Sequence, residues 1–148
     1  SLVIATANGD IDIAASSSAD VVGVFNGCFY TDPTTGKPTH SNYYPGSIAA
    51  SDIVAQVYDD PRIVFEVQCD GTLADTAVGE NADTTSTTSG STVTGLSSTE
   101  ISSSTGASTA QLRIIGISKD PDNSDTGSAN TNAYVLINEH AYTQTAGT

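Results

Sequence analysis

The fold of this chain is constrained most by its short runs of alternating apolar and polar residues, each closed by turn-forming residues. The clearest run is VYDDPRIVFEVQCDG, from Val57 to Gly71. Within it, every second residue from Ile63 to Cys69 is apolar, whereas most residues between them are polar. This alternation is typical of a half-buried β-strand, and Asp-Asp-Pro and Asp-Gly predict turns at its two ends.

Comparable runs occur along the whole chain. Asn8-Gly9 separates two apolar runs and predicts a β-hairpin. Further strands are predicted at VVGVFNGCFY, DIVAQVY, AQLRIIGIS and AYVLINEH. Only GTLADTAVGE predicts a short helical turn, which ends at Gly79. About eight short strands separated by turns predict an all-β fold, a compact β-barrel or β-sandwich of short antiparallel strands with long polar loops.

Two polar segments interrupt this pattern. Residues 31–47, TDPTTGKPTHSNYYPGS, carry the turn signals Asp-Pro and Gly-Lys-Pro and predict a projecting arm, either a loop or two strands with a tight tip. The segment from Thr84 to Thr109 is rich in Ser and Thr, which is typical either of disorder or of exposed strands; we favour a pair of polar edge strands with a mobile tip. Gly23 and Gly27 lie within a predicted strand and indicate a bulge or a close backbone approach.

The length of 148 residues suits one domain with its own core, and we expect a single β-rich domain over residues 1–148. Because the chain begins in strand-like sequence, we expect a short upstream N-terminal segment to be missing before Ser1. The predicted core takes alternate apolar positions of the strands: Val22, Val24, Ile53, Val57, Ile63, Phe65, Val67, Leu112, Ile114, Val135 and Ile137.

Seventeen acidic residues against four basic ones give a formal net charge of -13. Such a surface repels nucleic acid, which is bound through Lys and Arg, so we expect no nucleic-acid partner. No apolar run approaches the roughly 18 residues of a membrane-spanning helix, and we expect no membrane partner. Cys28 and Cys69 both lie in apolar runs and are predicted to be buried free thiols rather than a disulfide.

For each candidate catalytic group, a structural role is a better explanation than catalysis. Asp59 and Asp60 precede a proline and predict a turn, and Glu66 and Asp70 fall on the polar side of an alternating strand. Cys28 is the one nucleophile for which a base, His40, is a conceivable partner, yet a thiol among apolar neighbours is usually inert. The sequence therefore predicts no enzyme, no catalytic residue and no cofactor.

One loop is a candidate for a metal ion. DPDNSDTG brings Asp120, Asp122, Ser124 and Asp125 into a short segment that is dense in the oxygen ligands preferred by calcium. It lacks the glycine and the distal Glu of a helix-loop-helix calcium site, and Asp-rich turns are common without metal. We therefore predict no metal site and keep this loop as the calcium candidate.

Tyrosines are the remaining feature of the loops. Tyrosine is enriched at protein interfaces, so the SNYYPG segment of the arm is interpreted either as a docking element or as a cap on the end of the β-fold. The interface candidates are Tyr30, His40, Tyr43, Tyr44 and Pro45 in or beside the arm, with Leu2 and Val3 near the start of the chain.

Several motifs, taken in order, resemble a known family. Together they cover most of the chain, roughly residues 21–140. In order along the chain, they are GVFNGCFYTDPTTGKPTHSNYYPGS, VYDDPRIVFEVQCDG, VGENAD, TGLSSTEISSST, and LRIIGISKDPDN followed by VLINEH. This series resembles virion structural proteins of tailed bacteriophages, in particular capsid decoration (cement) proteins. The motifs are distinctive as a series, and none is diagnostic alone.

The resemblance implies a non-enzymatic β-protein on the outer surface of the capsid, assembled in the host cytoplasm. Its expected partners are the major capsid protein, whose neighbouring subunits it would stabilise, and further copies of itself in a homotrimer. Two alternatives stay open: another virion surface component such as a tail or fibre protein, or an extracellular filament or adhesion module that binds calcium or glycan.

Overall fold

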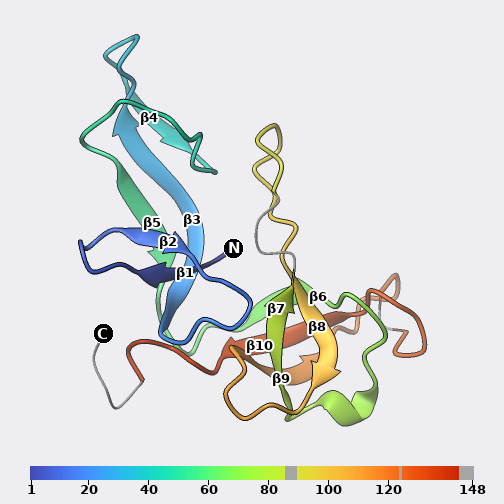
Figure 1. The fold of residues 1–148 in the computed structure, drawn as a ribbon. Helices are drawn as coiled ribbons and strands as arrows, with labels where there is room; N and C mark the ends of the chain where they lie inside the picture. Colours follow the sequence, from blue (N-terminus) through green and yellow to red (C-terminus); the bar gives the residue numbers. More distant parts are fainter. Residues whose placement is uncertain (86–89, 124, 144–148) are drawn as a thin grey trace.

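The computed structural model describes residues 1–85, 90–123 and 125–143. The chain folds into two antiparallel β-sheets and one 3₁₀ turn, in a sandwich-like arrangement that is not closed into a barrel (Figure 1). The predicted all-β class is thus confirmed, and of its two forms the sandwich is the one that applies. The short helical turn is also confirmed, since η1 spans Asp75–Ala77 and Gly79 follows it with a φ of 96°.

The first sheet, sheet A, contains the N-terminal strands. They are β1 (Leu2–Ala5), β2 (Ile11–Ile13), β3 (Val21–Thr31), β4 (Pro38–Ser41) and β5 (Val54–Tyr58). The predicted Asn8-Gly9 hairpin joins β1 to β2, and Gly9 adopts the positive φ that its turn requires.

The second sheet, sheet B, is formed by the C-terminal half in the order β6-β10-β9-β7-β8. These strands are β6 (Phe65–Gln68), β7 (Asn81–Thr85), β8 (Glu100–Thr105), β9 (Leu112–Ile117) and β10 (Asn132–Ile137). One isolated bridge between Cys69 and Ile101 brings the two edges of this sheet together. The Ser/Thr-rich segment was predicted to form two polar edge strands, but among its described residues it contributes one edge strand, β8, and only the end of β7, which lies inside the sheet between β8 and β9. Residues 86–89 of this segment lie outside the described residues.

β3 is the central strand of sheet A and extends well beyond sheet B. Val24 pairs with both β1 and β5, and Cys28 pairs with both β4 and β5. β1 and β4 therefore follow one another along one edge of β3, and β5 occupies the opposite edge. The predicted arm, residues 31–47, is the outer part of a longer projection that also includes parts of β3 and β5. We call the whole projection, residues 25–58, the arm from here on; it extends from the rest of the molecule and ends in the turn between β3 and β4 (Figure 1).

Two glycines allow the strands of sheet A to approach closely, as predicted. A side chain at Gly23 would collide with the backbone carbonyl of Tyr58 in β5. A Cβ at Gly27, whose φ is 127°, would lie 2.6 Å from the backbone oxygen of Ser41. The pairing of β3 with β5 shifts in register just before Gly27, which is the expected bulge.

The core lies between the base of sheet A and the inner face of sheet B. Leu2, Ala14 and Val21 from sheet A and its loop pack with buried residues of sheet B such as Ile101 and Leu73. Four predicted core residues, Leu112, Ile114, Val135 and Ile137, are buried in this cluster, and Val24, Phe65 and Val67 pack against it.

The other four predicted core residues, Val22, Ile53, Val57 and Ile63, are only half-buried and lie outside the core cluster. For Val22 the reason is a register shift: Gly23 pairs with Val3 and Val21 with Ile4, so Val22 is the extra residue. Val21 therefore takes the core position, with no exposed surface. A bulge of this kind breaks the strict alternation on which the prediction depends.

The stretch from Val57 to Gly71 crosses from one sheet to the other. β5 ends at Tyr58, residues 59–64 form the crossing, and β6 begins only at Phe65. The alternation of burial predicted from Ile63 to Cys69 is confirmed, since these apolar positions are more buried than the residues between them. The strand itself, Phe65–Gln68, is shorter than the alternating sequence pattern, because the first residues of that pattern belong to the crossing between the two sheets.

A buried glutamine joins the two sheets. The Gln111 side chain has no exposed surface, and its Nε2 donates hydrogen bonds to the backbone oxygens of Ala15 (2.8 Å) and Ser18 (3.1 Å) in the loop before β3. Its Oε1 accepts hydrogen bonds from the backbone N–H (3.2 Å) and the hydroxyl (2.7 Å) of Thr84 in β7. All the polar positions of this amide are satisfied, as a buried amide requires.

Candidate functional site

The outer face of the arm carries exposed apolar side chains. The register places His40 of β4 beside Phe29 of β3, and Phe29 beside Val54 of β5, so the three side chains form a row across the arm. The rings of Phe29 and His40 lie 4.8 Å apart at their centroids. Phe29 is 47% exposed and Val54 62% exposed, and Tyr58 on the same face is 49% exposed. We call these four residues the outer row.

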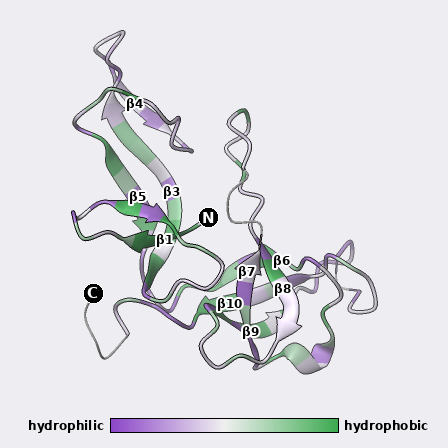
Figure 2. Ribbon diagram, viewed as in Figure 1, coloured by the Kyte–Doolittle hydropathy of each residue, from purple (hydrophilic) through white to green (hydrophobic). Residues whose placement is uncertain are grey.

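The opposite face of sheet A borders a groove with a volume of about 900 Å³. Its floor contains apolar residues from β1, β3 and β5, among them Val3, Phe25 and Val57. The facing wall is the 90–97 turn, which is closed by a hydrogen bond from the N–H of Ser91 to the oxygen of Leu96 (2.9 Å). In Figure 2, parts of β1, β3 and β5 are coloured as hydrophobic.

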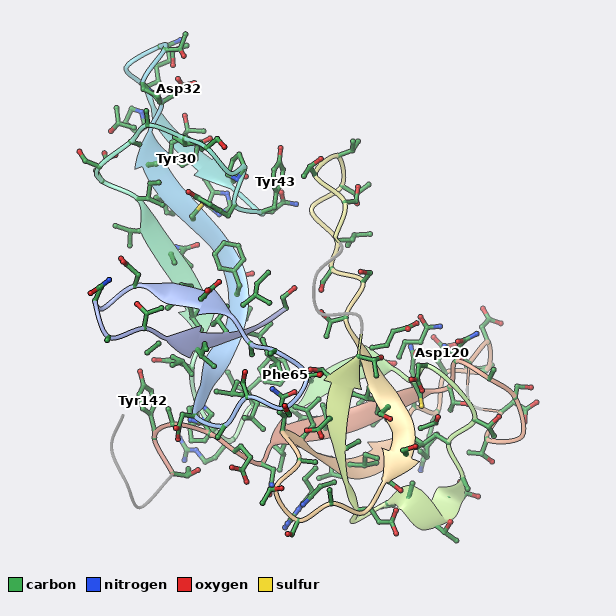
Figure 3. All side chains as sticks on the ribbon, viewed as in Figure 1. Tyr30, Asp32, Tyr43, Phe65, Asp120 and Tyr142 are labelled. Carbon is green, nitrogen blue, oxygen red and sulfur yellow. The ribbon has the colours of Figure 1, made fainter. Side chains whose placement is uncertain are left out.

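Two hydrogen bonds tie the 90–97 turn to the rest of the groove. Nδ2 of Asn42, just after β4, donates to the backbone oxygen of Thr94 (3.2 Å), and the hydroxyls of Ser1 and Ser97 lie 2.9 Å apart. Gly95 packs so closely on Asn42 that a Cβ at this position would overlap the amide. Figure 3 shows Tyr43 on the side of the arm that faces this turn.

The groove is acidic at its rim. Its charged side chains are Asp10 and Asp12, and no Lys or Arg is among the residues that line it. Among the residues that the structure describes, the hydrogen bond to Asp12 comes from the backbone N–H of its neighbour Ile13, at 2.7 Å. Ser1 is also among the lining residues, and burial lowers the pKa of its amino group.

The predicted interface residues fall into two groups. Tyr30, His40, Tyr43, Tyr44 and Pro45 all lie on the arm and are half-buried or exposed. Leu2 and Val3 are buried, with 8% and 3% of their surface exposed, because β1 pairs on both sides within sheet A. Leu2 belongs to the core and Val3 to the floor of the groove, so neither offers the exposed surface that was expected.

In the calcium candidate loop, the carboxylates of Asp120 and Asp125 accept hydrogen bonds from residues of the same loop. Oδ1 of Asp120 accepts the N–H of Asp122 (3.1 Å), and Asp125 accepts the N–H of Gly127 and the hydroxyl of Ser128, both at 2.9 Å. The hydrogen bond from Gly127 is the main reason that the pKa of Asp125 is lowered. Ser124 lies outside the described residues. In the part of the chain that the structure describes, no three His, Cys, Asp or Glu side chains are grouped as metal ligands.

The acids around the crossing between the sheets have structural partners. Asp60 forms an ion pair with Arg62 at 3.1 Å, and the hydrogen bonds from Arg62 lower the pKa of Asp60. Oδ1 of Asp70 accepts the backbone N–H of Ser103 at 2.8 Å, which connects the end of β6 to β8. Both carboxylates stabilise turns or strand contacts at the surface.

Both cysteines are free and buried, as predicted; Cys28 lies in β3 of sheet A, and Cys69 lies directly after β6 of sheet B. Burial raises the pKa of each thiol, which disfavours the reactive thiolate. Cys28 pairs with Ser41, whereas the adjacent Phe29 pairs with His40, so the thiol and the imidazole lie on opposite faces of the arm. This register does not form the thiol-imidazole pair of a cysteine nucleophile.

The groove was not predicted from the sequence, because its walls come from distant parts of the chain. One available signal was the presence of Val93 and Leu96 in a segment otherwise rich in Ser and Thr. Both are strongly exposed, at 91% and 70%.

None of the described residues forms a helix long and apolar enough to cross a membrane. The chain matches no protein-family model, and neither a curated protein nor a solved structure is significantly similar to it.

Proposed function

We propose that this protein is a bacteriophage capsid decoration protein, which binds the outer surface of the head and stabilises contacts between major capsid protein subunits. The observation that carries the proposal is the arm, a single layer of sheet with apolar side chains exposed on its outer face. A sheet normally buries its apolar face against a second layer. The outer row of Phe29, His40, Val54 and Tyr58 has no such layer within the described part of the chain.

The resemblance to decoration proteins supports this assignment of the arm. Each contact of an arm with the shell would bury modest apolar area, at about 25 cal/mol per Å². On a shell that displays many copies, these contacts add up and hold neighbouring subunits together. The net charge of -13 is consistent with an outer location, away from packaged DNA.

Binding to heads that lack the protein tests the proposal directly. Purified protein is mixed with undecorated heads, and the bound fraction is measured by co-sedimentation. Phe29→Glu places a charge in the outer row without changing a residue that lines the groove, and we expect it to weaken binding at least tenfold. Val78→Glu is the matched control, since Val78 is exposed directly after η1 and outside the arm, and it is expected to bind like the wild type. Equal binding of both variants would contradict the role of the arm.

Stoichiometry separates this function from a tail or fibre role. A decoration protein is expected in a copy number comparable to that of the major capsid protein, whereas a tail or fibre protein is present in few copies. Quantitative mass spectrometry of purified virions measures this ratio. Particles without the protein are expected to break at lower temperature or milder osmotic shock, and equal resistance would contradict a stabilising role.

Self-association belongs to the same proposal. We expect a homotrimer in solution or on the shell, and light scattering coupled to size-exclusion chromatography measures its mass. A monomer at all concentrations, both free and on imaged heads, would remove the trimer from the proposal.

A further inference from the structure

The groove between sheet A and the 90–97 turn is lined by apolar side chains that do not fill it. Leu96 projects from the turn and is 70% exposed, and Ile13 of β2 is exposed on the facing side. A volume of about 900 Å³ is at the upper end of what protein binding pockets usually offer. Because the floor also contains the half-buried side chains of Phe25 and Val57, an apolar occupant would bury surface on both walls.

The shape of the groove favours an extended chain. The hydrogen bonds Asn42–Thr94 and Ser1–Ser97 both connect the 90–97 turn to the side of sheet A, so the occupant has to be narrow. A helix with its side chains has a diameter of about 10–12 Å, whereas an extended segment is thinner. Within the described residues, β2 and β5 each pair with one strand only, and both line the groove. Their free edges offer backbone groups to an added strand.

The acidic rim of the groove favours basic residues at the two ends of the bound segment. Asp10 and Asp12 are the charged side chains of the lining, and neither forms an ion pair with a described residue. Lys or Arg beside an apolar segment would face these two carboxylates. A second copy of this chain is a poor occupant, because it carries the same net charge of -13 and only four basic residues.

We propose that the groove binds an extended segment of a partner protein, in which alternate apolar side chains are flanked by Lys or Arg. The apolar side chains contact Leu96 on one wall and the floor of sheet A on the other, and the basic flanks face Asp10 and Asp12. This inference rests on the proposed function in one respect: the shell protein is the expected source of the segment.

A defined peptide tests the groove without the shell. The probe is a fluorescein-labelled peptide, Lys-Lys-Val-Thr-Val-Ser-Val-Lys-Lys, titrated with the full chain and followed by fluorescence anisotropy. A second peptide replaces every Lys by Glu. We expect the Lys peptide to bind at least tenfold more tightly than the Glu peptide, with an affinity that falls as salt is added.

Two pairs of variants locate the binding. Leu96→Glu is expected to weaken binding at least fivefold, whereas Val93→Glu, on the same turn but outside the groove lining, leaves it unchanged. The double variant Asp10→Asn with Asp12→Asn is expected to weaken binding about threefold to tenfold, given the usual strength of exposed charge pairs. Asp75→Asn, on η1 far along the chain, is its control. No binding of the Lys peptide, or equal binding to the Leu96 and Val93 variants, would overturn the proposal.

Photo-cross-linking on heads separates this inference from the proposed function. A benzophenone amino acid is placed at position 96 or, as a control, at position 93, and the protein is bound to undecorated heads. Cross-links to the shell protein from position 96 alone support the inference. Binding to heads without such cross-links overturns the groove as the shell contact and leaves the decoration function standing. Peptide binding without any binding to heads overturns the decoration function and leaves the groove standing.

Discussion

Replacing Gln111 by Ala is expected to destabilise the junction between the two sheets. The substitution removes four hydrogen bonds, two to backbone oxygens of the loop before β3 and two to Thr84. At about 1 kcal/mol for each bond, and with buried partners left unsatisfied, the free energy of unfolding falls by about 3–5 kcal/mol. For a chain of this size, this lowers the melting temperature by roughly 10 °C.

The measurement is urea unfolding followed by far-UV circular dichroism, with hydrogen exchange of the loop at residues 15–18 as a local readout. Thr84→Val removes only the hydroxyl and is expected to cost about 1 kcal/mol. Because the two side chains interact directly, the double variant is expected to be less destabilised than the sum of the singles. Gln68→Ala, on the exposed side of β6, is the control. A loss below about 1 kcal/mol for Gln111→Ala would refute the reasoning.

Three further predictions concern the backbone, a histidine and the thiols. Gly23→Ala is expected to disrupt the pairing of β3 with β5, measured as faster hydrogen exchange in β5; unchanged exchange would contradict the close approach. Burial lowers the pKa of His140, so the unfolded state binds more protons and stability is expected to fall as the pH drops below about 6.5. His140→Asn should flatten this slope in urea unfolding between pH 5 and pH 7, roughly the range in which histidine titrates, and an unchanged slope would contradict the role of His140. Cys28 and Cys69 are expected to react with a thiol reagent only slowly in the native protein and rapidly in urea, and fast native labelling would be inconsistent with their burial.

The alternating runs predicted the strands well, because burial on one face is a local property of a strand. The burial pattern from Ile63 to Cys69, the hairpin at Asn8-Gly9 and the arm all agree with the structure. The exceptions occur where the backbone departs from regular pairing. The register shift beside Val22 moves the core position to Val21, and the alternating pattern before Phe65 continues through a crossing that is not a strand.

The candidate site was predictable only in part. The arm and its tyrosines follow from turn signals and composition, which are local. The groove depends on tertiary contacts between segments as distant in sequence as Asn42 and Thr94, so no spacing along the chain encodes it. Gln111 is a similar case, since nothing beside it in the sequence indicates that its amide is fully buried.

The continuous course of β3, from the junction to the tip of the arm, has a mechanical consequence. The N–H of Val21 donates to the oxygen of Glu139 (2.8 Å), and the N–H of Ala141 donates back to Val21 (2.9 Å), so the lower end of the strand is anchored to the C-terminal segment. Hydrogen bonds between antiparallel strands lie perpendicular to the strand direction. A pull on the tip along β3 therefore loads the bonds to β1 and β5 together in shear, whereas a sideways pull peels them apart one after another. The arm is built to resist tension along its length.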